Sequence, residues 1–547
     1  MTTPGALGQT TVFRNGALFD GHHYRGALGD VVVADGRITE VRPHAQADVY
    51  GRDARTVDLA GGLLAPGFVD AHVHPIQGGL ERLRCDLSEH STRQEYVAAV
   101  ASYAAANPEA PWILGGGWAM PAFPGGTPLA ADLDAVVPDR PVFLPNRDHH
   151  GAWVNSRALE LAGVDRHTPD PPDGRIERDA DGHPTGTLHE GATALVSRHL
   201  PRTTGADYRA ALLAGQRYLH SLGVTGWQDA IVGSYSGMDD PASTYVAAAA
   251  SGELRCAVVG ALWWDRRLGV EQIPDLVGRR DALTGGRFRA TTVKVMQDGV
   301  AENGTAALTA PYLDAAGRPT ANSGHSFVDP AVLGEAVAGL DAEGFQVHVH
   351  AIGDRAVREA LDAFEGTDPS RRHHVAHLQL VHPDDVPRFG RLGVAANIQA
   401  LWACLDDQMV DLTLPFLGEE RGRWQYPFGD LHRAGARLVA GSDWPVSTPD
   451  PLAALHVAVN RWVHGEDGRA GSEAFLPEQA LALETAFAAY TSGSAWVCGR
   501  DDAGVVAPGN VADLVVLDRD PFAGPPEEIG AARVTSVWVD GVAVHEV

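Results

Sequence analysis

The feature that most constrains the fold is an alternation, through the middle of the chain, of short apolar runs with longer helical segments. Helical stretches such as residues 207–222, 329–344 and 354–366 separate several of the runs. Alternation of this kind is typical of parallel βα units, and eight of them predict an α/β fold closed as a (β/α)8 TIM barrel. The eight runs are LLAPGFVDAHVH, GVTGWQDA, LRCAVVGALWW, ATTVKVMQDG, FQVHVHA, HHVAHLQL, GVAANIQ and ARLVAGSDWP.

The two ends of the chain resemble each other and differ from the middle. Both carry short β-rich runs broken by Asn-Gly or Asp-Gly, which are hairpin signals. Neither end has enough strands for a stable sheet of its own. We therefore expect one small composite β-sandwich built from residues 1–64 and 492–547, with the barrel domain over residues 65–491.

The first two barrel strands are separated by residues 76–215, which is too long for a simple crossover. We expect this segment to be an insertion that builds part of a substrate pocket.

Bulk composition excludes some partners. The formal net charge of −27 argues against nucleic acid and against an anionic membrane, so a small-molecule substrate is expected. The N-terminal sequence has no signal-peptide pattern, no run is long enough to span a bilayer, and the 4 cysteines form no paired motif. A cytoplasmic protein is the expectation. The oligomeric state stays open, with a homodimer as one expected form.

Ionisable side chains occur where several of the predicted strands end. His72 and His74 are two apart in GFVDAHVHP, so in a strand they project from the same face and can chelate one divalent ion. The carboxyl ends of barrel strands converge on one mouth, where we expect six potential ligands to meet. They are His72, His74, Lys294, His350, His377 and Asp443.

Sequence position alone leaves alternatives at several of these sites. His348 lies on the same strand face as His350, and His377 has His373 and His374 as neighbours. Asp443 by itself could be a helix N-cap.

Lys294 stands out because it is the chain's only lysine, and the other 42 of the 43 basic residues are arginine (43 − 1 = 42). Arginine serves elsewhere as the cation, so this position is expected to need chemistry that arginine lacks. The alternative is an ordinary ion pair.

The chain resembles the amidohydrolase superfamily of metal-dependent hydrolases, in particular the amidohydrolase 3 branch that contains N-substituted formamide deformylase. The hallmark order of that superfamily is His-x-His, Lys, His, His, Asp. The matching stretches are GFVDAHVHP, HGAWVNSRALELAG, GRIERDADGHPTGTLHEGA, VKVMQDG, VHAIGDRAV, AHLQLVHPDDVPRFGRLGV, GSDWPV and VADLVVLDRDP.

The resemblance implies a particular ligand set. It selects His350 and His377 over their neighbours and makes Lys294 an N-carboxylated lysine that bridges two metal ions. One ion would sit on His72, His74 and Asp443, and the second on His350 and His377. Zn²⁺, two per chain, is the first choice, because imidazole and carboxylate ligands with open positions suit it; another divalent metal or a mononuclear site is the alternative.

The resemblance also implies hydrolysis of a non-peptide C–N bond, in an amide such as an N-acyl or N-formyl amine, by a metal-activated water. Asp443 would act as the general base and then protonate the leaving amine. The alternatives are the same site acting on an ester, lactone or cyclic imide, or as a related isomerase. A metal-free barrel that serves as a structural or interaction module is an alternative of a different class.

Further residues are candidates for the pocket. His150 is predicted as a catalytic residue that contacts the substrate or the oxyanion, because the resemblance aligns it with a recurring histidine before WVNS. Asn155 is a second candidate substrate contact from the same segment. The aromatic residues Trp118, Trp402 and Trp444 are candidates for an apolar binding wall.

Overall fold

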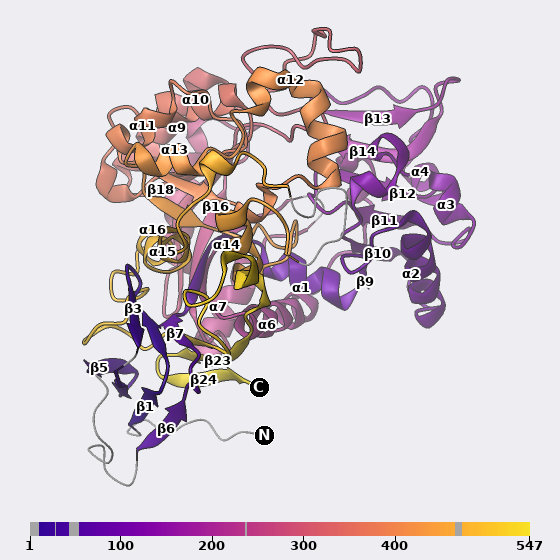
Figure 1. The fold of residues 1–547 in the computed structure, drawn as a ribbon. Helices are drawn as coiled ribbons and strands as arrows, with labels where there is room; N and C mark the ends of the chain where they lie inside the picture. The colour runs from indigo at the N-terminus through magenta and orange to yellow at the C-terminus, as the bar shows by residue number, and fades with distance from the viewer. Residues whose placement is uncertain (1–9, 28, 43–53, 236–237, 465–472) are drawn as a thin grey trace.

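The structure is a computed structural model and describes residues 10–27, 29–42, 54–235, 238–464 and 473–547. Its centre is an eight-stranded sheet in which every neighbouring pair is parallel, in the order β21-β20-β19-β18-β17-β16-β15-β8 (Figure 1). The strands are β8 (Phe68–Val73), β15 (Val224–Val232), β16 (Ala257–Trp263), β17 (Phe288–Met296), β18 (Gln346–Ala351), β19 (His374–His377), β20 (Ala395–Ile398) and β21 (Leu438–Ala440). Each predicted run overlaps one of them, so the predicted barrel is confirmed.

Closure of the barrel occurs just beyond the end of β21. The amide of Asp443 donates to the carbonyl of His72 (2.7 Å), and the amide of His74 donates to the carbonyl of Trp444 (2.8 Å). Gly441 permits this close approach, because a Cβ there would lie 2.6 Å from the Cβ of His72. We call this contact between β8 and residues 441–444 the seam.

Helices cover the outside of the barrel, and N-capping residues mark where several of them begin. The helix before β15, α6 (Gly205–Ser221), begins with a capping box formed by Thr204 and Asp207. The helix α9 has Asp329 as its N-cap and proline at its first position. The helices from β15 onward are α7 (Ala242–Ser251), α8 (Ile273–Leu283), α9 (Pro330–Ala342), α10 (Asp354–Ala363), α11 (Val386–Leu392), α12 (Leu414–Gly422), α13 (Phe428–Arg433), α14 (Pro451–Asn460), α15 (Leu483–Ala488) and α16 (Ser494–Val497).

Strands from both ends of the chain form the second part of the molecule. A six-stranded sheet has the order β24-β23-β22-β7-β2-β3, and a four-stranded sheet has the order β5-β4-β1-β6. Figure 1 shows the indigo N-terminal and yellow C-terminal strands side by side at one end of the barrel. The composite sandwich predicted with the fold class is confirmed. Its strands are β1 (Thr11–Arg14), β2 (Ala17–Phe19), β3 (Tyr24–Ala27), β4 (Val31–Ala34), β5 (Arg37–Val41), β6 (Arg55–Asp58), β7 (Leu63–Pro66), β22 (Leu514–Leu517), β23 (Val534–Val539) and β24 (Val542–Glu546).

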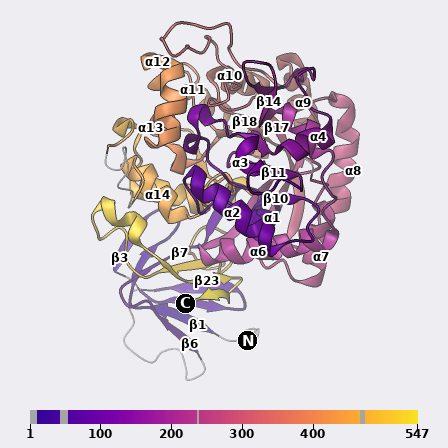
Figure 2. The same ribbon diagram turned by 90° about the vertical axis from the view of Figure 1, so that its right-hand side faces the viewer.

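The segment between β8 and β15 contains a sheet of its own, in the order β13-β14-β12-β11-β10-β9. Figure 2 shows its strands beside α1 (Pro75–Leu83) and α2 (Arg93–Ala106), with α6 next to α1. The strands are β9 (Cys85–Asp86), β10 (Ile113–Gly116), β11 (Val142–Pro145), β12 (Gly151–Val154), β13 (Gly174–Arg178) and β14 (Pro184–Glu190), joined by α3 (Ala130–Asp134), α4 (Ser156–Ala162) and α5 (Ala194–Ser197).

No helix within the described ranges combines the length and the apolar character that crossing a bilayer requires.

Candidate metal centre

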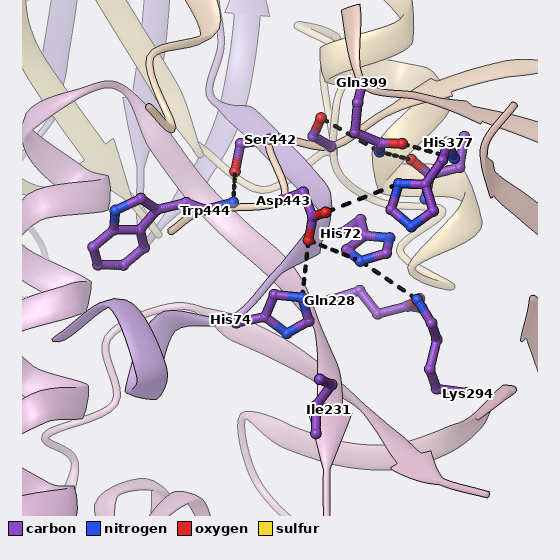
Figure 3. Close-up of polar contacts among 12 residues, drawn as sticks. His72, His74, Gln228, Ile231, Lys294, His377, Gln399, Ser442, Asp443 and Trp444 are labelled. Atoms are coloured by element: carbon purple, nitrogen blue, oxygen red, sulfur yellow. Dashed lines mark hydrogen bonds and ion pairs between the residues drawn. The ribbon is translucent and has the colours of Figure 1, made fainter. Parts of the chain in front are cut away.

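The first group of predicted ligands meets at the seam (Figure 3). Asp443 Oδ1 lies 3.1 Å from His72 Nε2 and 2.9 Å from His74 Nε2. For comparison, two ligands of one tetrahedral zinc ion stand roughly 3.3 Å apart when the Zn–N distance is about 2.0–2.1 Å. The Asp443 carboxylate is therefore close enough to each of these two imidazoles to share an ion with it, with a small expansion.

The other predicted ligands surround this group. His377 Nδ1 is 3.9 Å from Asp443 Oδ2, and Lys294 Nζ is 3.5 Å from His72 Nε2. The ring of His350 has its centroid 4.4 Å from that of His377. All six predicted residues line one cavity of about 570 Å³. Among the described residues, His72, His377 and Asp443 form the group whose ligand atoms all lie within 4.8 Å of one another.

Backbone strain occurs at two of these residues. His377 has φ of 80° and Asp443 has φ of 57°, in the left-handed region that non-glycine residues seldom adopt. Such strain costs on the order of 1–3 kcal/mol and is found mostly at functional sites.

Protonation states in the cluster suit a cation. Burial lowers the pKa of His72 to about 3 and lowers the pKa values of His350 and His377 far below the ordinary range, so these imidazoles are neutral at pH 7. Burial opposes ionisation of Asp443, but the hydrogen bond with His74 Nε2 helps to hold its pKa well below the usual value. The cluster therefore offers neutral imidazoles and an ionised carboxylate, which is the donor set of a hydrolytic metal site.

A chain of hydrogen bonds determines which nitrogen of His72 carries the proton. It begins at Gln346, whose amide nitrogen donates to the carbonyls of Arg372 (2.8 Å) and Val497 (2.8 Å). The amide oxygen of Gln346 must therefore accept, and it accepts from the amide nitrogen of Gln228 at 2.9 Å.

The resulting orientation of the Gln228 amide determines which nitrogen of His348 is protonated. Its amide oxygen faces His348 Nδ1 at 2.7 Å, so that nitrogen carries hydrogen and His348 Nε2 is the acceptor. Because His348 Nε2 is 3.0 Å from His72 Nδ1, the latter must donate. The lone pair of His72 then lies on Nε2, the nitrogen that faces Asp443 and Lys294. We refer to Gln346, Gln228 and His348 as the tautomer relay.

A buried carboxylate fixes the backbone around the seam. Asp70 Oδ1 accepts from the amides of His72 (3.1 Å) and Ser442 (3.0 Å), and Oδ2 accepts from the Ser442 hydroxyl (2.6 Å). Asp70 thus ties the strand that carries His72 to the loop that carries Asp443.

Unpartnered nitrogens provide a test of whether a metal fits. Both ring nitrogens of buried His377, and Nδ1 of His74, have no hydrogen-bond partner among the described residues. Leaving buried polar atoms unpaired costs about 1–3 kcal/mol each. A divalent cation would satisfy one ring nitrogen of His377, so the residues fit the metal.

Two of the predicted pocket residues line the same cavity. The ring of Trp402 stacks on His377 with an interplanar angle of 5° and a centroid distance of 5.4 Å. His150 Nδ1 is 3.0 Å from both carboxylate oxygens of Glu190. Burial disfavours the cation, but Glu190 outweighs it and raises the pKa of His150 to about 9. His150 is therefore an imidazolium at the cavity wall.

The structure does not bring Trp118 or Asn155 to the cavity. Trp118 packs in a separate apolar cluster and donates from Nε1 to the Leu144 carbonyl at 2.8 Å. Asn155 is the N-cap of α4, and its amide also bonds to Val142, Val137 and Arg140. The polar atoms of both side chains are already hydrogen-bonded within the protein. Their placement therefore does not support the predicted substrate contacts.

Trp444, also a candidate for the wall, packs beneath the cavity instead. Its ring lies against Gly78 of α1 and 5.3 Å from the ring of Tyr218, measured between centroids.

Several residues that line the cavity, or that contact His150 or the seam, were not predicted from the sequence. Tyr235 and Trp263 line the cavity with their rings 4.9 Å apart, centroid to centroid. Glu190 and Asp70 act through His150 and the seam. A signal existed only for Asp70, which precedes His72 by two and so shares its strand face.

Comparison with known proteins gives the family. The profile of the amidohydrolase family matches residues 55–545, and the chain belongs to that family. A putative amidohydrolase, YtcJ of Bacillus subtilis, is 30% identical over 94% of this chain and 96% of its own length. Family membership supports a metal-dependent hydrolase that takes a small-molecule substrate, and it implies a divalent metal.

Other relatives cover the chain to a similar extent. N-substituted formamide deformylase of Arthrobacter pascens is 28% identical over 94% of both chains. Protein LONG AFTER FAR-RED 3 of Arabidopsis thaliana, whose name states no activity, is 31% identical over 100% of this chain and 93% of its own. Among solved structures, an uncharacterised metal-dependent hydrolase of Pyrococcus horikoshii OT3 superposes with a TM-score of 0.73 at 26% identity, over 95% of this chain and 99% of that one. The predicted resemblance is confirmed.

Proposed function

We propose that the protein is a metal-dependent amidohydrolase that cleaves a non-peptide C–N bond, in an N-acyl or N-formyl amine. The observation that carries this proposal is the convergence of neutral imidazoles and the Asp443 carboxylate on one cavity at the carboxyl ends of the barrel strands. The similarity to N-substituted formamide deformylase supports an amide as the substrate.

The residues that would hold the metal are His72, His74, His350, His377 and Asp443. A divalent ion bound there would lower the pKa of a water molecule towards neutrality and would polarise the substrate carbonyl. Zn²⁺ is our first choice because the donors are imidazoles and a carboxylate.

The chain's own residues supply the proton transfers. Asp443 is ionised, so its carboxylate can accept a proton from the attacking water and then deliver it to the nitrogen of the leaving amine. His150 lies in the same wall as an imidazolium and can donate a hydrogen bond to a substrate oxygen that gains negative charge. Trp402, Tyr235 and Trp263 provide apolar surface that limits water in the cavity.

Lys294 is proposed to be N-carboxylated and to bridge two ions. Burial lowers its pKa to about 7, so a neutral amine is present at neutral pH. A neutral amine adds CO₂ and releases one proton, which gives an anionic carbamate with two oxygens.

The proposed location is the cytoplasm, supported by the 4 cysteines, which are buried and form no disulfide in the structure. The homodimer stays a prediction.

The test is a substrate panel assayed with metal-replete protein, containing N-formyl amines, N-acyl amines, esters and lactones. We expect turnover of the amides, loss of at least about a hundredfold in kcat for Asp443→Asn, and no turnover after chelation. Turnover of the esters alone would contradict the C–N bond assignment.

A further inference from the structure

A second cavity adjoins the one that holds the metal ligands. It has about 590 Å³ of free space, part of which is open to solvent, and its lining includes Gln77 and His149, which also line the first cavity. Gln77 Nε2 and His149 Nδ1 are hydrogen-bonded at 2.7 Å, so this pair forms the partition between the two cavities. We call the second cavity the side chamber.

One face of α1 forms a wall of the side chamber. Gln77, Leu80, Glu81 and Arg84 all line it, at the spacing that places residues on one side of a helix. Because His74 is the N-cap of α1 and Arg84 its C-cap, the helix runs from the candidate metal ligands to Arg84. Ten residues at 1.5 Å each place the two Cα atoms roughly 15 Å apart.

The remaining lining is largely apolar. Opposite α1, the chamber is walled by Leu114, Phe143 and Pro145 of the insertion sheet, with Leu200 and Met238 beyond them. Figure 2 shows α1 next to β10, which supplies Leu114; β11, which supplies Phe143 and Pro145, pairs with β10. A hydrocarbon chain is the ligand chemistry that such walls favour.

Arg84 introduces a positive charge at the far end. Its Nη2 donates to the Thr203 hydroxyl at 3.0 Å, and it forms no ion pair with a carboxylate of the described part of the chain. The nearest acidic group on the helix, Glu81, is already used, because its carboxylate is 3.1 Å from His149 Nε2. Burial lowers the pKa of Arg84, and the charges of Asp207 and Glu81, neither of them in an ion pair with it in the described part of the chain, offset this only in part. Asp207 of α6 acts on it only at longer range.

We propose that the side chamber is a substrate subsite for a medium-length hydrocarbon chain that ends in a carboxylate, with the carboxylate bound by Arg84. The guanidinium fork suits a carboxylate, which would replace the missing anion. The substrate would span both cavities after the side chain of His149 moves aside. This inference rests on the proposed function and adds a substrate class to it: amides of amphiphilic ω-carboxylates.

Binding is measured first, by calorimetry with octanoate and with its neutral analogue octanamide. We expect wild-type protein to bind octanoate at least about tenfold more tightly than it binds butyrate or octanamide. Arg84→Gln should lose that advantage, and Arg84→Lys should retain part of it. The matched control is Arg82→Gln, because Arg82 is an exposed arginine of the same helix that stacks on Tyr218 and does not line the chamber.

Two results would overturn the subsite. One is octanoate binding that is the same in wild type and Arg84→Gln, as it would be if the metal alone held the carboxylate. The other is the absence of any preference for octanoate over octanamide in the wild-type protein, a measurement that does not depend on any variant folding.

Hydrolysis separates this inference from the proposed function. The paired substrates are N-formyl-8-aminooctanoate and N-formyloctylamine, which differ only in the terminal carboxylate. We expect Arg84→Gln to lower kcat/KM about tenfold for the first and to leave the second unchanged. If neither is hydrolysed but octanoate binding still depends on Arg84, the amide function fails and the subsite stands. If both are hydrolysed and neither depends on Arg84, the subsite fails and the amide function stands.

Discussion

Lys294 is the only lysine in the chain, and it is buried in β17 beside His72. A carbamate at this position would explain why arginine, which is always protonated, does not replace it. We expect Lys294→Arg to fold as the wild type does, by circular dichroism, and to lose most of its bound metal, by elemental analysis. An arginine variant with full metal content would contradict the bridging role. Carbon-13 NMR of protein equilibrated with labelled CO₂ can detect the carbamate directly, since no other side-chain amine is present.

The tautomer relay makes a prediction about residues that never touch the metal. Removing the Gln346 amide frees Gln228 to turn its NH₂ towards His348, which would reverse the relay and put the proton of His72 on Nε2. We expect Gln346→Leu to weaken zinc binding about 10–100-fold in a chelator competition. Gln216→Leu is the control, because Gln216 is a buried glutamine whose side-chain amide, among the described residues, bonds to the backbone of Glu253 and Arg255 and not to the relay. Equal loss in both variants would show a general packing effect.

The His150–Glu190 pair predicts a pH dependence of stability. The folded pKa of His150, about 9, lies above its ordinary value of about 6.5, so its contribution is fully present below pH 6.5 and is lost as pH rises through 9. The difference in thermal midpoint between wild type and Glu190→Gln should therefore be largest near pH 6.5 and shrink towards pH 9.5. A difference that stays constant over this range would mean that His150 is neutral in the folded protein.

At the scale of elements, the seam depends on Asp70 and Ser442. Ser442→Ala removes a hydroxyl that donates to buried Asp70 and accepts from the Trp444 amide. We expect a loss of about 1–3 kcal/mol in the free energy of unfolding and weaker metal binding. Ser442→Thr keeps the hydroxyl and is the matched variant; if it loses as much as Ser442→Ala, steric fit rather than the hydrogen bond governs the seam.

The barrel strands were predictable because each is apolar and bounded by helix or turn signals, but their limits were not. Residues 63–74 form one uninterrupted run in the sequence, yet the structure divides it at Gly67 into β7 of the sandwich and β8 of the barrel. A Cβ on Gly67 would lie 2.2 Å from Thr225, a tertiary contact that no local pattern encodes. The sheet β9–β14 was missed because its strands are short and because β13 lies outside β14 at the edge of an otherwise sequential order.

In the site, likewise, the ligands could be predicted from the sequence but the residues that orient them could not. His72 and His74 could be found from strand periodicity, and Lys294 and Asp443 from their positions in predicted strands. The choice of His350 and His377 over neighbouring histidines needed the resemblance to the amidohydrolase superfamily. The partners that orient them could not, because a glutamine such as Gln346 acts only through where its amide points. Asn155 and Trp118 were predicted to contact substrate because of their residue type. In the structure Asn155 caps α4 and Trp118 packs in an apolar cluster of the insertion, roles that the sequence position alone did not indicate.

At the scale of the whole molecule, the sandwich and the barrel share a continuous chain segment. We propose that the sandwich comprises residues 1–64 and 492–547. Its strand β22 pairs with β7, which leads directly into β8. Removing residues 512–547 should therefore give aggregated protein without metal, by size-exclusion chromatography. Removing only residues 540–547, which include the partly exposed edge strand β24, should leave a metal-binding protein. A folded, metal-binding product of the longer deletion would show that the barrel does not need the sandwich.

The two hydrogen bonds of the seam use the backbones of His72, His74 and Asp443, the same residues whose side chains are the proposed ligands. An ion held by those side chains would therefore cross-link the first and eighth strands where the barrel closes. Loss of the ion and parting of the first and eighth strands are then coupled events. Amide protons of His74 and Asp443 should exchange with solvent slowly when the ion is bound and much faster after chelation.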